Sequence, residues 1–184
     1  MPKPLIVAIV GPTAAGKTAL SLALASRFPA EVVSVDSRQV YRGMDIGTAK
    51  PTTMERARLP HHLIDVADPT DDFNLAAYLD IARPTIRDVH DRGNLPLLVG
   101  GTGQYLWALL EAWRIPSVAP DAAYRQELAA IAEAQGAQAL HTRLAQVDAE
   151  SAASIDPRNQ RRVIRALEVH HQTGVPFSRV RCRG

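Results

Sequence analysis

The sequence has 184 residues, of which 46% are apolar and 22% charged, and its formal net charge is +2. A chain of this length forms one domain, or a domain with a modest insertion, and its apolar content allows a real core, which excludes disordered and fibrous proteins. Its apolar runs are shorter than a membrane span, no signal-peptide pattern opens the chain, and Cys182 is the only cysteine, so we expect a cytoplasmic protein without a disulfide or a cysteine-based metal cluster.

The first predicted element is a strand over residues 5–10, which leads into a glycine-rich phosphate-binding loop (P-loop). The loop is followed by a predicted helix over residues 19–27, and it reads Gly11-Pro12-Thr13-Ala14-Ala15-Gly16-Lys17-Thr18. Its glycines let backbone N–H groups point at phosphate oxygens, at the positive end of the helix dipole. Lys17 adds a positive charge, and Thr18 can hold a Mg²⁺ ion that bridges the same phosphates. The sequence therefore predicts a phosphorylated ligand with magnesium.

Two further predicted strands also end in residues that can do chemistry. Residues 31–35 lead into Asp36-Ser37-Arg38-Gln39, and residues 95–99 lead into Gly100-Gly101-Thr102-Gly103. Helical patterns over residues 75–92 and 104–111 alternate with the strands, which predicts an α/β fold, a P-loop NTPase-like parallel sheet with helices on both faces. In such a sheet the carboxyl ends of the strands share one edge, so we expect the three loops to line a single cleft.

The segment between the second and third of these strands has little periodicity. We expect loops around one short additional strand over residues 63–66, which are apolar but few. The pair His61-His62 precedes this strand. These histidines could bind a metal ion or transfer protons, but no third ligand stands at metal spacing, which favours a structural role.

Beyond Trp113 the predicted elements are helices. After a linker over residues 116–120, residues 121–136 and 137–147 are rich in alanine, glutamine and glutamate and predict two helices with no strand between them. A third helix begins near residue 157 or 159 and ends before Gly174-Val175-Pro176. We therefore divide the chain into a core (1–115), a helical insertion or lid (116–156), and a basic helix with a truncated return to the core (157–184).

The third helix is strongly basic. From Arg158 onward there are seven arginines and one acid, Glu168, whereas residues 1–157 contain 14 basic and 18 acidic residues. A helical wheel places four arginines on the face opposite to Val163, Ile164 and Leu167, namely Arg158, Arg161, Arg162 and Arg165. We expect an exposed basic stripe that binds a polyanion such as nucleic acid, although a solvated surface would look the same.

Asp36 is the main candidate for catalysis. It could hold magnesium opposite Thr18, or it could act as a base, as a carboxylate at this place does in small-molecule kinases. Most P-loop proteins cleave or transfer a terminal phosphoryl group, but we find no convincing apolar strand that ends in a second magnesium-binding acid. A kinase is therefore one interpretation of these residues.

Five segments of the chain follow one another in a specific order. They are residues 11–18, 36–51, 60–65, 99–103 and 159–169, and the block DSRQVYRGMDIGTAKP that starts at Asp36 is the most specific. This order resembles that of tRNA dimethylallyltransferases over nearly the whole chain, with a small departure at Ala15, where serine is common. The resemblance implies transfer of a dimethylallyl group from dimethylallyl diphosphate to the exocyclic amino group of the adenine 3′ of the anticodon, with release of diphosphate.

The resemblance also implies roles for individual residues. The P-loop, with Lys17 and magnesium on Thr18, would stabilise the departing diphosphate, and Asp36 would take a proton from the adenine amino group. Thr102 would hydrogen-bond the substrate or orient Asp36, whereas its structural alternative is a helix N-cap. Contacts with tRNA are implied for Asp36, Ser37, Arg38, Gln39, Thr102, Tyr124, Gln160, Arg161, Arg162, Val163 and Ile164. Tyr124 could equally serve only in packing, and the helical insertion would be an RNA-binding lid.

The expected partners are tRNA and dimethylallyl diphosphate, without a membrane, and we expect a monomer. Members of this family are longer, so segments absent from this sequence would supply more of the nucleotide-binding core, RNA-binding surface and an arginine for the diphosphate. Phosphate binding is therefore expected whether or not the chain turns over substrate. Two alternatives remain, a small-molecule kinase that consumes ATP and a non-catalytic tRNA-binding remnant, while prenylation of free adenine nucleotides is disfavoured by the basic helix.

Overall fold

The computed structural model of the protein describes residues 5–113, 115 and 118–180. The chain divides into two compact units, Met1–Ala112 and Trp113–Gly184. The elements of the first unit are β1 (Val7–Val10), α1 (Lys17–Ala25), β2 (Ala30–Ser34), α2 (Thr53–Arg58), β3 (His61–His62), α3 (Leu75–Asp91), β4 (Leu95–Gly100) and α4 (Gly103–Leu110). Those of the second unit are α5 (Ala122–Gln135), α6 (Ala137–Val147), α7 (Ala149–Ser154), α8 (Gln160–Thr173) and α9 (Phe177–Val180).

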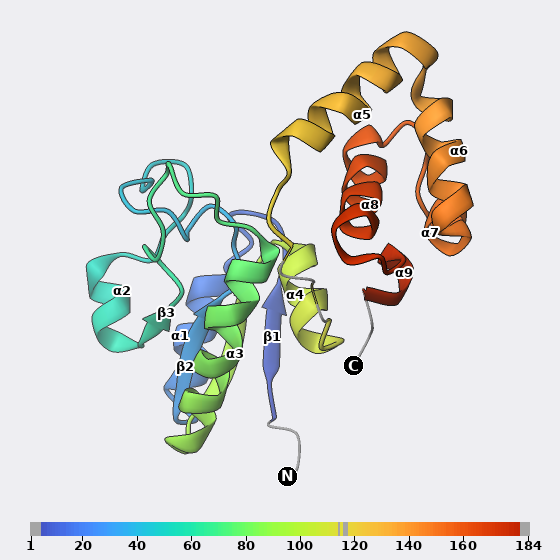
Figure 1. Ribbon diagram of the computed structural model, residues 1–184. Coiled ribbons are helices and arrows are strands. Elements are labelled where there is room, and N and C mark those ends of the chain that lie inside the picture. Colours follow the sequence, from blue (N-terminus) through green and yellow to red (C-terminus); the bar gives the residue numbers. More distant parts are fainter. Residues whose placement is uncertain (1–4, 114, 116–117, 181–184) are drawn as a thin grey trace. The chain divides into compact units, whose positions relative to one another are not determined.

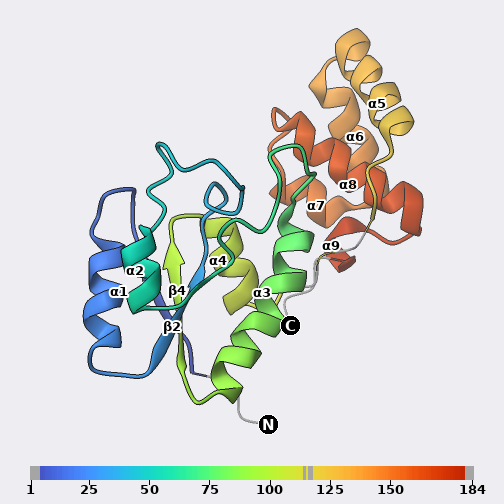
Figure 2. The ribbon, with the colours of Figure 1, turned by 90° about the vertical axis from the view of Figure 1, so that its left-hand side faces the viewer.

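The strands of the first unit form one parallel sheet in the order β1-β4-β2-β3. The register pairs Val10 of β1 with Gly100 of β4, and Ser34 of β2 with Val99 of β4. The carboxyl ends of these three neighbouring strands therefore lie side by side. Figures 1 and 2 show α1 on one face of the sheet and α3 and α4 on the other. The predicted α/β fold with a helix-flanked parallel sheet is confirmed.

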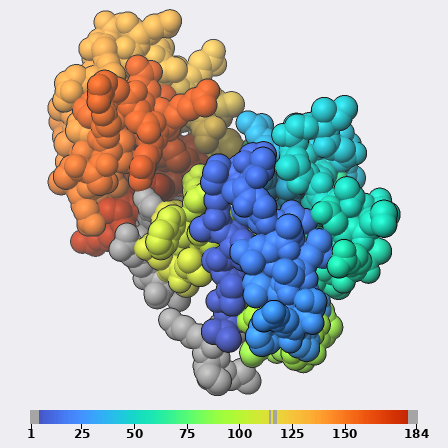
Figure 3. Space-filling view, turned by 180° about the vertical axis from the view of Figure 1, so that it is seen from behind, coloured from blue at the N-terminus to red at the C-terminus, as the bar shows by residue number. Residues whose placement is uncertain are grey.

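The two faces of the sheet are buried by alternate residues of each strand, as the period of two requires. Val32 and Leu97 join the core that packs on α1, where Leu22 is partly buried. Their neighbours Val33 and Leu98 are fully buried as well, and α3 packs against β2 and β4. Burial on both faces explains why these strands are continuous apolar runs. In the space-filling view the blue segment that contains α1 lies at the surface of the first unit, beside the teal segment that contains α2 (Figure 3).

The short additional strand lies elsewhere than predicted. β3 consists of His61 and His62, which pair with Val32 and Val33 of β2. Residues 63–66 are instead a turn, in which Leu63 and Asp65 take left-handed φ angles of 62° and 58°. The apolar side chain of Leu63 is buried in this turn, at 5% exposure, which explains an apolar residue outside a strand. The prediction of a strand over residues 63–66 was therefore wrong.

The second unit is a helical bundle in its described part. The two helices predicted over residues 121–136 and 137–147 are α5 and α6, and the third is α8. All three contribute to one core, which contains Leu128, Leu140, Leu144, Val163 and Leu167. The described residues of the two predicted segments, 118–156 and 157–180, thus pack together in this unit. Among the described helices, none combines the length and apolar character that a membrane crossing needs.

Candidate functional site

The P-loop joins β1 to α1, and its conformation depends on its glycines. Gly16 occupies the position before α1 with a left-handed φ of 77°, where an L side chain would be strained. The Lys17 ammonium donates hydrogen bonds to two carbonyl oxygens of the loop, Gly11 O at 3.0 Å and Pro12 O at 2.7 Å. The first turn of α1 contains no acidic residue. A positive charge and the positive end of a helix dipole therefore coincide at this loop.

Thr18 is the second residue of α1. Its carbonyl accepts a hydrogen bond from Ser21 Oγ at 2.8 Å. Its own hydroxyl has no hydrogen-bond partner among the residues that the structure describes. That hydroxyl is consequently available to a ligand or a metal ion next to the P-loop.

Asp36 follows β2 and is held by the backbone that comes after it. Its Oδ1 accepts hydrogen bonds from the N–H groups of Arg38 at 2.9 Å and Gln39 at 3.4 Å. Oδ2 has no partner within the described part of the chain, and the residue is half-buried. One carboxylate oxygen thus fixes the side chain, and the other is free to contact a substrate.

Thr102 ties the end of β4 to the end of β2. Its N–H donates to Val35 O at 3.0 Å, and its Oγ1 accepts from the Ser37 N–H at 2.9 Å and donates to Ser37 Oγ at 3.2 Å. Thr102 does occupy the N-cap position of α4, but its side chain makes no capping hydrogen bond. The hydroxyl therefore serves the loop after β2, not the helix.

Two glycines allow the three loops to approach one another. A Cβ atom at Gly100 would lie 2.5 Å from Val35 O, and one at Gly101 would lie 3.3 Å from Gly11 O. The first contact is impossible and the second is tight, so the ends of β1, β2 and β4 come together only because side chains are absent here. The structure thus gathers the P-loop, Asp36 and Thr102 at one edge of the sheet.

A pair of tyrosines supports this edge from the α3 and α4 side. Tyr78 of α3 is fully buried, donates a hydrogen bond to Ser34 O at 3.0 Å, and stacks on Tyr105 of α4 with ring centroids 3.8 Å apart. Burial, with smaller contributions from Tyr41 and the charge of Asp36, raises the pKa of Tyr105 to about 12. Neither tyrosine was predicted from the sequence, because no local pattern distinguishes them from other core aromatics.

Side chains of the block over residues 36–51 form several hydrogen bonds with other residues of the same block. Gln39 accepts a hydrogen bond from Ser34 Oγ at 3.1 Å and donates to Thr48 O at 3.1 Å and Ala49 O at 3.0 Å. Arg38, by contrast, is exposed. Of the side chains assigned to RNA in this loop, Arg38 therefore faces solvent, whereas the Gln39 amide is occupied within the fold.

Lys50 anchors the far end of the same block. Its side chain is only 4% exposed, and its ammonium donates to Tyr41 O at 2.7 Å, Asp45 Oδ1 at 2.7 Å and Asp65 Oδ1 at 2.6 Å. Burial lowers the pKa of Lys50, but the two carboxylates outweigh this effect and keep it above the ordinary value. Lys50 is consequently a structural cation.

The histidine pair belongs to a polar cluster near the start of β2. His61 Nδ1 lies 2.6 Å from Leu59 O, and His62 Nε2 is bonded to the buried carboxylate of Glu31. Glu31 also accepts hydrogen bonds from Arg92 at 3.0 and 2.7 Å and from Asn94 at 2.6 Å. These contacts, those of Arg92 first, lower the pKa of Glu31 to about 2. The cluster supports the structural interpretation of both histidines.

In the second unit, the predicted basic stripe is smaller than expected. Arg161 and Arg162 are exposed on α8, and neither forms an ion pair within the described residues. Arg158 precedes the helix and is bound to Asp156, with Nη2 2.6 Å from Oδ2. Arg165 is turned inward, where it bonds Glu168 and donates to Val118 O at 3.0 Å. The prediction that Arg165 belongs to an exposed stripe was wrong, because a buried acid three residues away draws it in.

The other residues of α8 assigned to RNA differ in exposure. Gln160 begins the helix and is exposed, whereas Val163 is fully buried in the helical core and Ile164 packs partly against it. Tyr124 of α5 is half-buried and stacks on His171 of α8, with ring centroids 4.0 Å apart and an interplanar angle of 12°. Packing therefore accounts for the burial of Val163 and for the partial burial of Tyr124.

Glu168 is the acid that organises these helices. It is fully buried, and it accepts hydrogen bonds from Arg125 at 2.6 and 2.9 Å, from Arg165, and from the Asp121 N–H at 2.7 Å. Burial raises the pKa of Glu168, but the hydrogen bonds from Arg125 and Arg165 outweigh it, and the pKa lies below its ordinary value. The side chain is therefore a charged link between α5 and α8.

The chain is similar to two described protein families and to known transferases. Residues 39–183 match the family described as IPP transferase, and residues 4–65 match the family described as isopentenyl transferase. The chain is 60% identical over 176 residues to the tRNA dimethylallyltransferase of Roseiflexus sp. strain RS-1, covering 96% of this chain and 58% of that protein. It is 56% identical over 178 residues to the tRNA dimethylallyltransferase of Chloroflexus aurantiacus strain J-10-fl, covering 97% of this chain and 60% of the relative.

Solved structures give the same result. The full-length tRNA isopentenylpyrophosphate transferase from Bacillus halodurans matches with a TM-score of 0.61 and 52% identity, over 95% of this chain and 58% of that one. A eukaryotic dimethylallyltransferase captured acting on tRNA matches with a TM-score of 0.74 and 28% identity, over 96% of this chain and 44% of that one. The chain thus spans roughly half of the length of these proteins.

Proposed function

Because the chain belongs to the IPP transferase family, we propose that the whole protein transfers a dimethylallyl group from dimethylallyl diphosphate to the exocyclic amino group of an adenine in tRNA, 3′ of the anticodon. One observation of the structure carries this proposal. The P-loop, Asp36 and Thr102 lie at the carboxyl ends of three neighbouring parallel strands. An anion-binding loop beside a carboxylate is the arrangement that departure of diphosphate and removal of a proton require.

In the proposed reaction the P-loop binds the diphosphate as a leaving group. Negative charge grows on the diphosphate while the bond between its oxygen and the allylic carbon breaks, and phosphorus is not attacked. Lys17 is held by two neutral carbonyl oxygens, which are weaker partners than a phosphate oxygen. Its ammonium can therefore turn to the leaving group, together with the N–H groups of the loop.

A magnesium ion fits this site. Within the described residues no group of three histidine, cysteine or acidic side chains could hold a metal ion alone. Magnesium, however, is commonly bound by one or two protein oxygens together with phosphate oxygens and water. The hydroxyl of Thr18, which has no partner in the described part of the protein, is such an oxygen. When bound there, the ion would neutralise charge on the diphosphate.

Asp36 is proposed to be the base. The adenine amino group is a poor nucleophile because its lone pair is delocalised into the ring, and removal of its proton favours attack on the allylic carbon. The free Oδ2 of Asp36 can accept that proton while Oδ1 keeps the side chain in place. Thr102 acts on the same loop through Ser37, so its role would be to position Asp36.

The target adenine is part of a folded RNA and has to leave its stack to reach such a site. Arg38 beside Asp36, and Gln160, Arg161 and Arg162 on α8, are the exposed side chains proposed to contact the RNA. We further propose that the protein acts in the cytoplasm, where tRNA is abundant, and as a monomer.

The test is incorporation of label from dimethylallyl diphosphate into unmodified tRNA. We expect incorporation by the whole protein, and loss of more than about 100-fold in Asp36→Ala and Lys17→Ala. Only Lys17→Ala should also weaken binding of inorganic diphosphate, since Asp36 does not belong to the P-loop. Conversion of ATP to ADP without label in the RNA would indicate the kinase instead, and an unaffected Asp36→Ala variant would remove the proposed base.

A further inference from the structure

Tyr105 carries a hydroxyl group that the fold does not use. The residue is 6% exposed, and its ring stacks on Tyr78. The Tyr78 hydroxyl donates to Ser34 O, whereas the Tyr105 hydroxyl makes no hydrogen bond with any residue that the structure describes. Among the described residues, no fully buried side-chain oxygen or nitrogen lacks a partner. The hydroxyl oxygen of Tyr105 therefore reaches the surface, at the end of a side chain that is otherwise enclosed.

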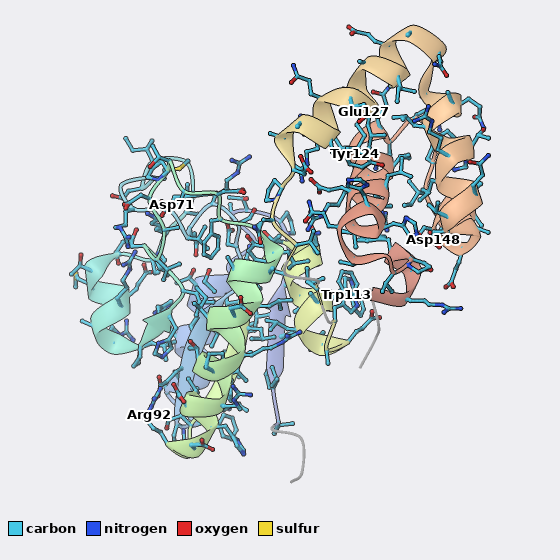
Figure 4. All side chains as sticks on the ribbon, in the orientation of Figure 1. Asp71, Arg92, Trp113, Tyr124, Glu127 and Asp148 are labelled. Carbon is cyan, nitrogen blue, oxygen red and sulfur yellow. The ribbon has the colours of Figure 1, made fainter. Side chains whose placement is uncertain are left out.

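Tyr105 stands at the same edge of the sheet as the proposed site. It lies in the first turn of α4, and its N–H donates to Thr102 O at 3.0 Å. The helices α3 and α4 lie next to each other, with side chains between them (Figure 4). On the α3 side, Tyr78 is bonded to the carbonyl of Ser34, two residues before Asp36. The stacked ring of Tyr105 is thus held between the ends of β2 and β4.

Two groups of the segment after β2 act on the Tyr105 hydroxyl. Burial raises the pKa of Tyr105 to about 12, and Tyr41 and the charge of Asp36 add to this effect. Because such an effect weakens with distance, Asp36 and the hydroxyl are near each other. A hydroxyl with this pKa stays protonated at neutral pH and can donate a hydrogen bond. Next to the free acceptor Oδ2 of Asp36, the site therefore has a donor that is fixed by stacking.

An acceptor beside a donor is complementary to the amino edge of adenine. The exocyclic amino group of adenine is a donor, and the ring nitrogens on either side of it, N1 and N7, are acceptors. Guanine presents a carbonyl oxygen, O6, in place of the amino group. That oxygen would face the carboxylate of Asp36, and two acceptors repel each other. Asp36 and Tyr105 together can therefore distinguish adenine from guanine.

We propose that the Tyr105 hydroxyl donates a hydrogen bond to a ring nitrogen of the target adenine, N1 or N7, while Asp36 faces the amino group. Tyr105 is then a specificity-determining residue that contacts the base directly. This inference rests on the proposed function, which supplies the adenine and the role of Asp36. It adds a second polar contact, which fixes the orientation of the base relative to Asp36.

The experiment uses tRNA in which the target adenine is replaced by 1-deazaadenine or 7-deazaadenine. Each analogue has a C–H group in place of one ring nitrogen. Incorporation of label from dimethylallyl diphosphate is compared between the whole wild-type protein and its Tyr105→Phe variant. With adenine, we expect kcat/KM of Tyr105→Phe to be about tenfold lower. With the analogue that lacks the bonded nitrogen, the two proteins should agree to within about twofold, because neither can form the bond.

Two results would overturn the proposal. One is an unchanged kcat/KM of Tyr105→Phe with adenine. The other is a tenfold loss that persists with adenine and with both analogues, because the effect of the hydroxyl would then not depend on a ring nitrogen. The analogues change the reactivity of the amino group equally for both proteins, so the ratio of the two proteins isolates the contact.

Tyr78→Phe is the matched control. It removes a hydroxyl from the same stack, but one that is bonded to Ser34 O. Any loss of activity in Tyr78→Phe should be the same with adenine and with both analogues. A loss that depends on the analogue would show that the stack as a whole, and not the Tyr105 hydroxyl, senses the ring nitrogen. Thermal unfolding verifies that both variants fold.

A binding measurement separates this inference from the transferase reaction. Adenosine has no phosphate for the P-loop, so its saturation-transfer NMR signals report contacts of the nucleoside alone. Wild type should bind adenosine about tenfold more tightly than Tyr105→Phe, and this difference should vanish with the matching deaza nucleoside. If this pattern is found and no label enters tRNA, the proposed function fails and the contact stands. If label is transferred and neither measurement depends on a ring nitrogen, the contact fails alone.

Discussion

The hydroxyl of Thr102 accepts a hydrogen bond from the Ser37 N–H at 2.9 Å, across 65 positions of the sequence. This bond fixes the loop that carries Asp36 to the end of β4. Thr102→Val keeps the shape of the side chain and removes the bond, so we expect kcat to fall about tenfold with a smaller change of KM. Thr102→Ser retains the hydroxyl and should restore most of the activity. Steady-state kinetics with tRNA checks this, and an unchanged kcat in Thr102→Val would contradict a positioning role.

Gly100 is required by the close approach of β4 to Val35. Gly100→Ala places a Cβ atom 2.5 Å from a backbone oxygen, which cannot move as a flexible side chain would. We expect a loss of about 1–3 kcal/mol in the free energy of unfolding. The control is Gly103→Ala, where a Cβ would meet nothing within 4 Å. Urea denaturation of both variants measures the difference, and equal stabilities would show that the strand ends adjust freely.

Gln39 and Arg38 are neighbours with different expected roles. Gln39→Leu leaves Ser34 Oγ and the carbonyls of Thr48 and Ala49 without a partner, so we expect about 1–3 kcal/mol of destabilisation. Hydrogen exchange of residues 41–50 should become faster. Arg38→Gln should keep the stability and weaken RNA binding. A stable Gln39→Leu variant that only loses affinity for RNA would instead make Gln39 a direct RNA contact.

Glu31 makes stability depend on pH in the acid range. Its pKa is about 2 in the folded protein and 4.5 in its unperturbed state, so its contribution is complete above about pH 4.5 and is lost as the pH falls to about 2. We expect Glu31→Gln to lower the free energy of unfolding by about 2 kcal/mol at pH 7. This is less than the pKa shift alone would give, because Arg92 is half exposed and solvent screens its charge. The difference from wild type should vanish near pH 2. Thermal unfolding from pH 2 to 7, with Asp80→Asn as a control on the surface of α3, measures this, and a constant difference would exclude Glu31 as the titrating group.

The sequence contains most of what is needed to predict the fold. Residues 31–35 and 95–99 form β2 and β4 to within one residue, because strands buried on both faces are continuous apolar runs. α2 was missed although its signal is present, since Thr52 and Glu55 form a capping box. α7 was missed in the same way, with Asp148 as its cap. Capping residues of this kind can therefore be used to predict short helices from the sequence.

The candidate site was predictable to a lesser extent. The P-loop and the position of Asp36 after a strand follow from local spacing, and the register of the sheet brings them together. The partners of Gln39 and Lys50 do not follow from spacing, because they depend on how the loop over residues 41–50 turns back. The inward turn of Arg165 likewise depends on the burial of Glu168, which a helical wheel does not reveal. Contacts between distant segments are thus the part that the sequence alone does not determine.

Two ion pairs, Arg165–Glu168 and Arg158–Asp156, would limit how many counterions are released if RNA binds α8 as proposed. Arg165 is paired with Glu168 and the exposed Arg158 with Asp156, which leaves Arg161 and Arg162 as the arginines of α8 without an ion pair to any described residue. Each contact with a single-stranded phosphate contributes about −0.7 to the slope of log affinity against log salt concentration. The contribution of α8 to that slope should therefore be about −1.4, half of the value of about −2.8 that four exposed arginines would give. The difference in this slope between wild type and the double variant Arg161→Gln/Arg162→Gln, measured by RNA binding at several salt concentrations, gives the contribution of α8.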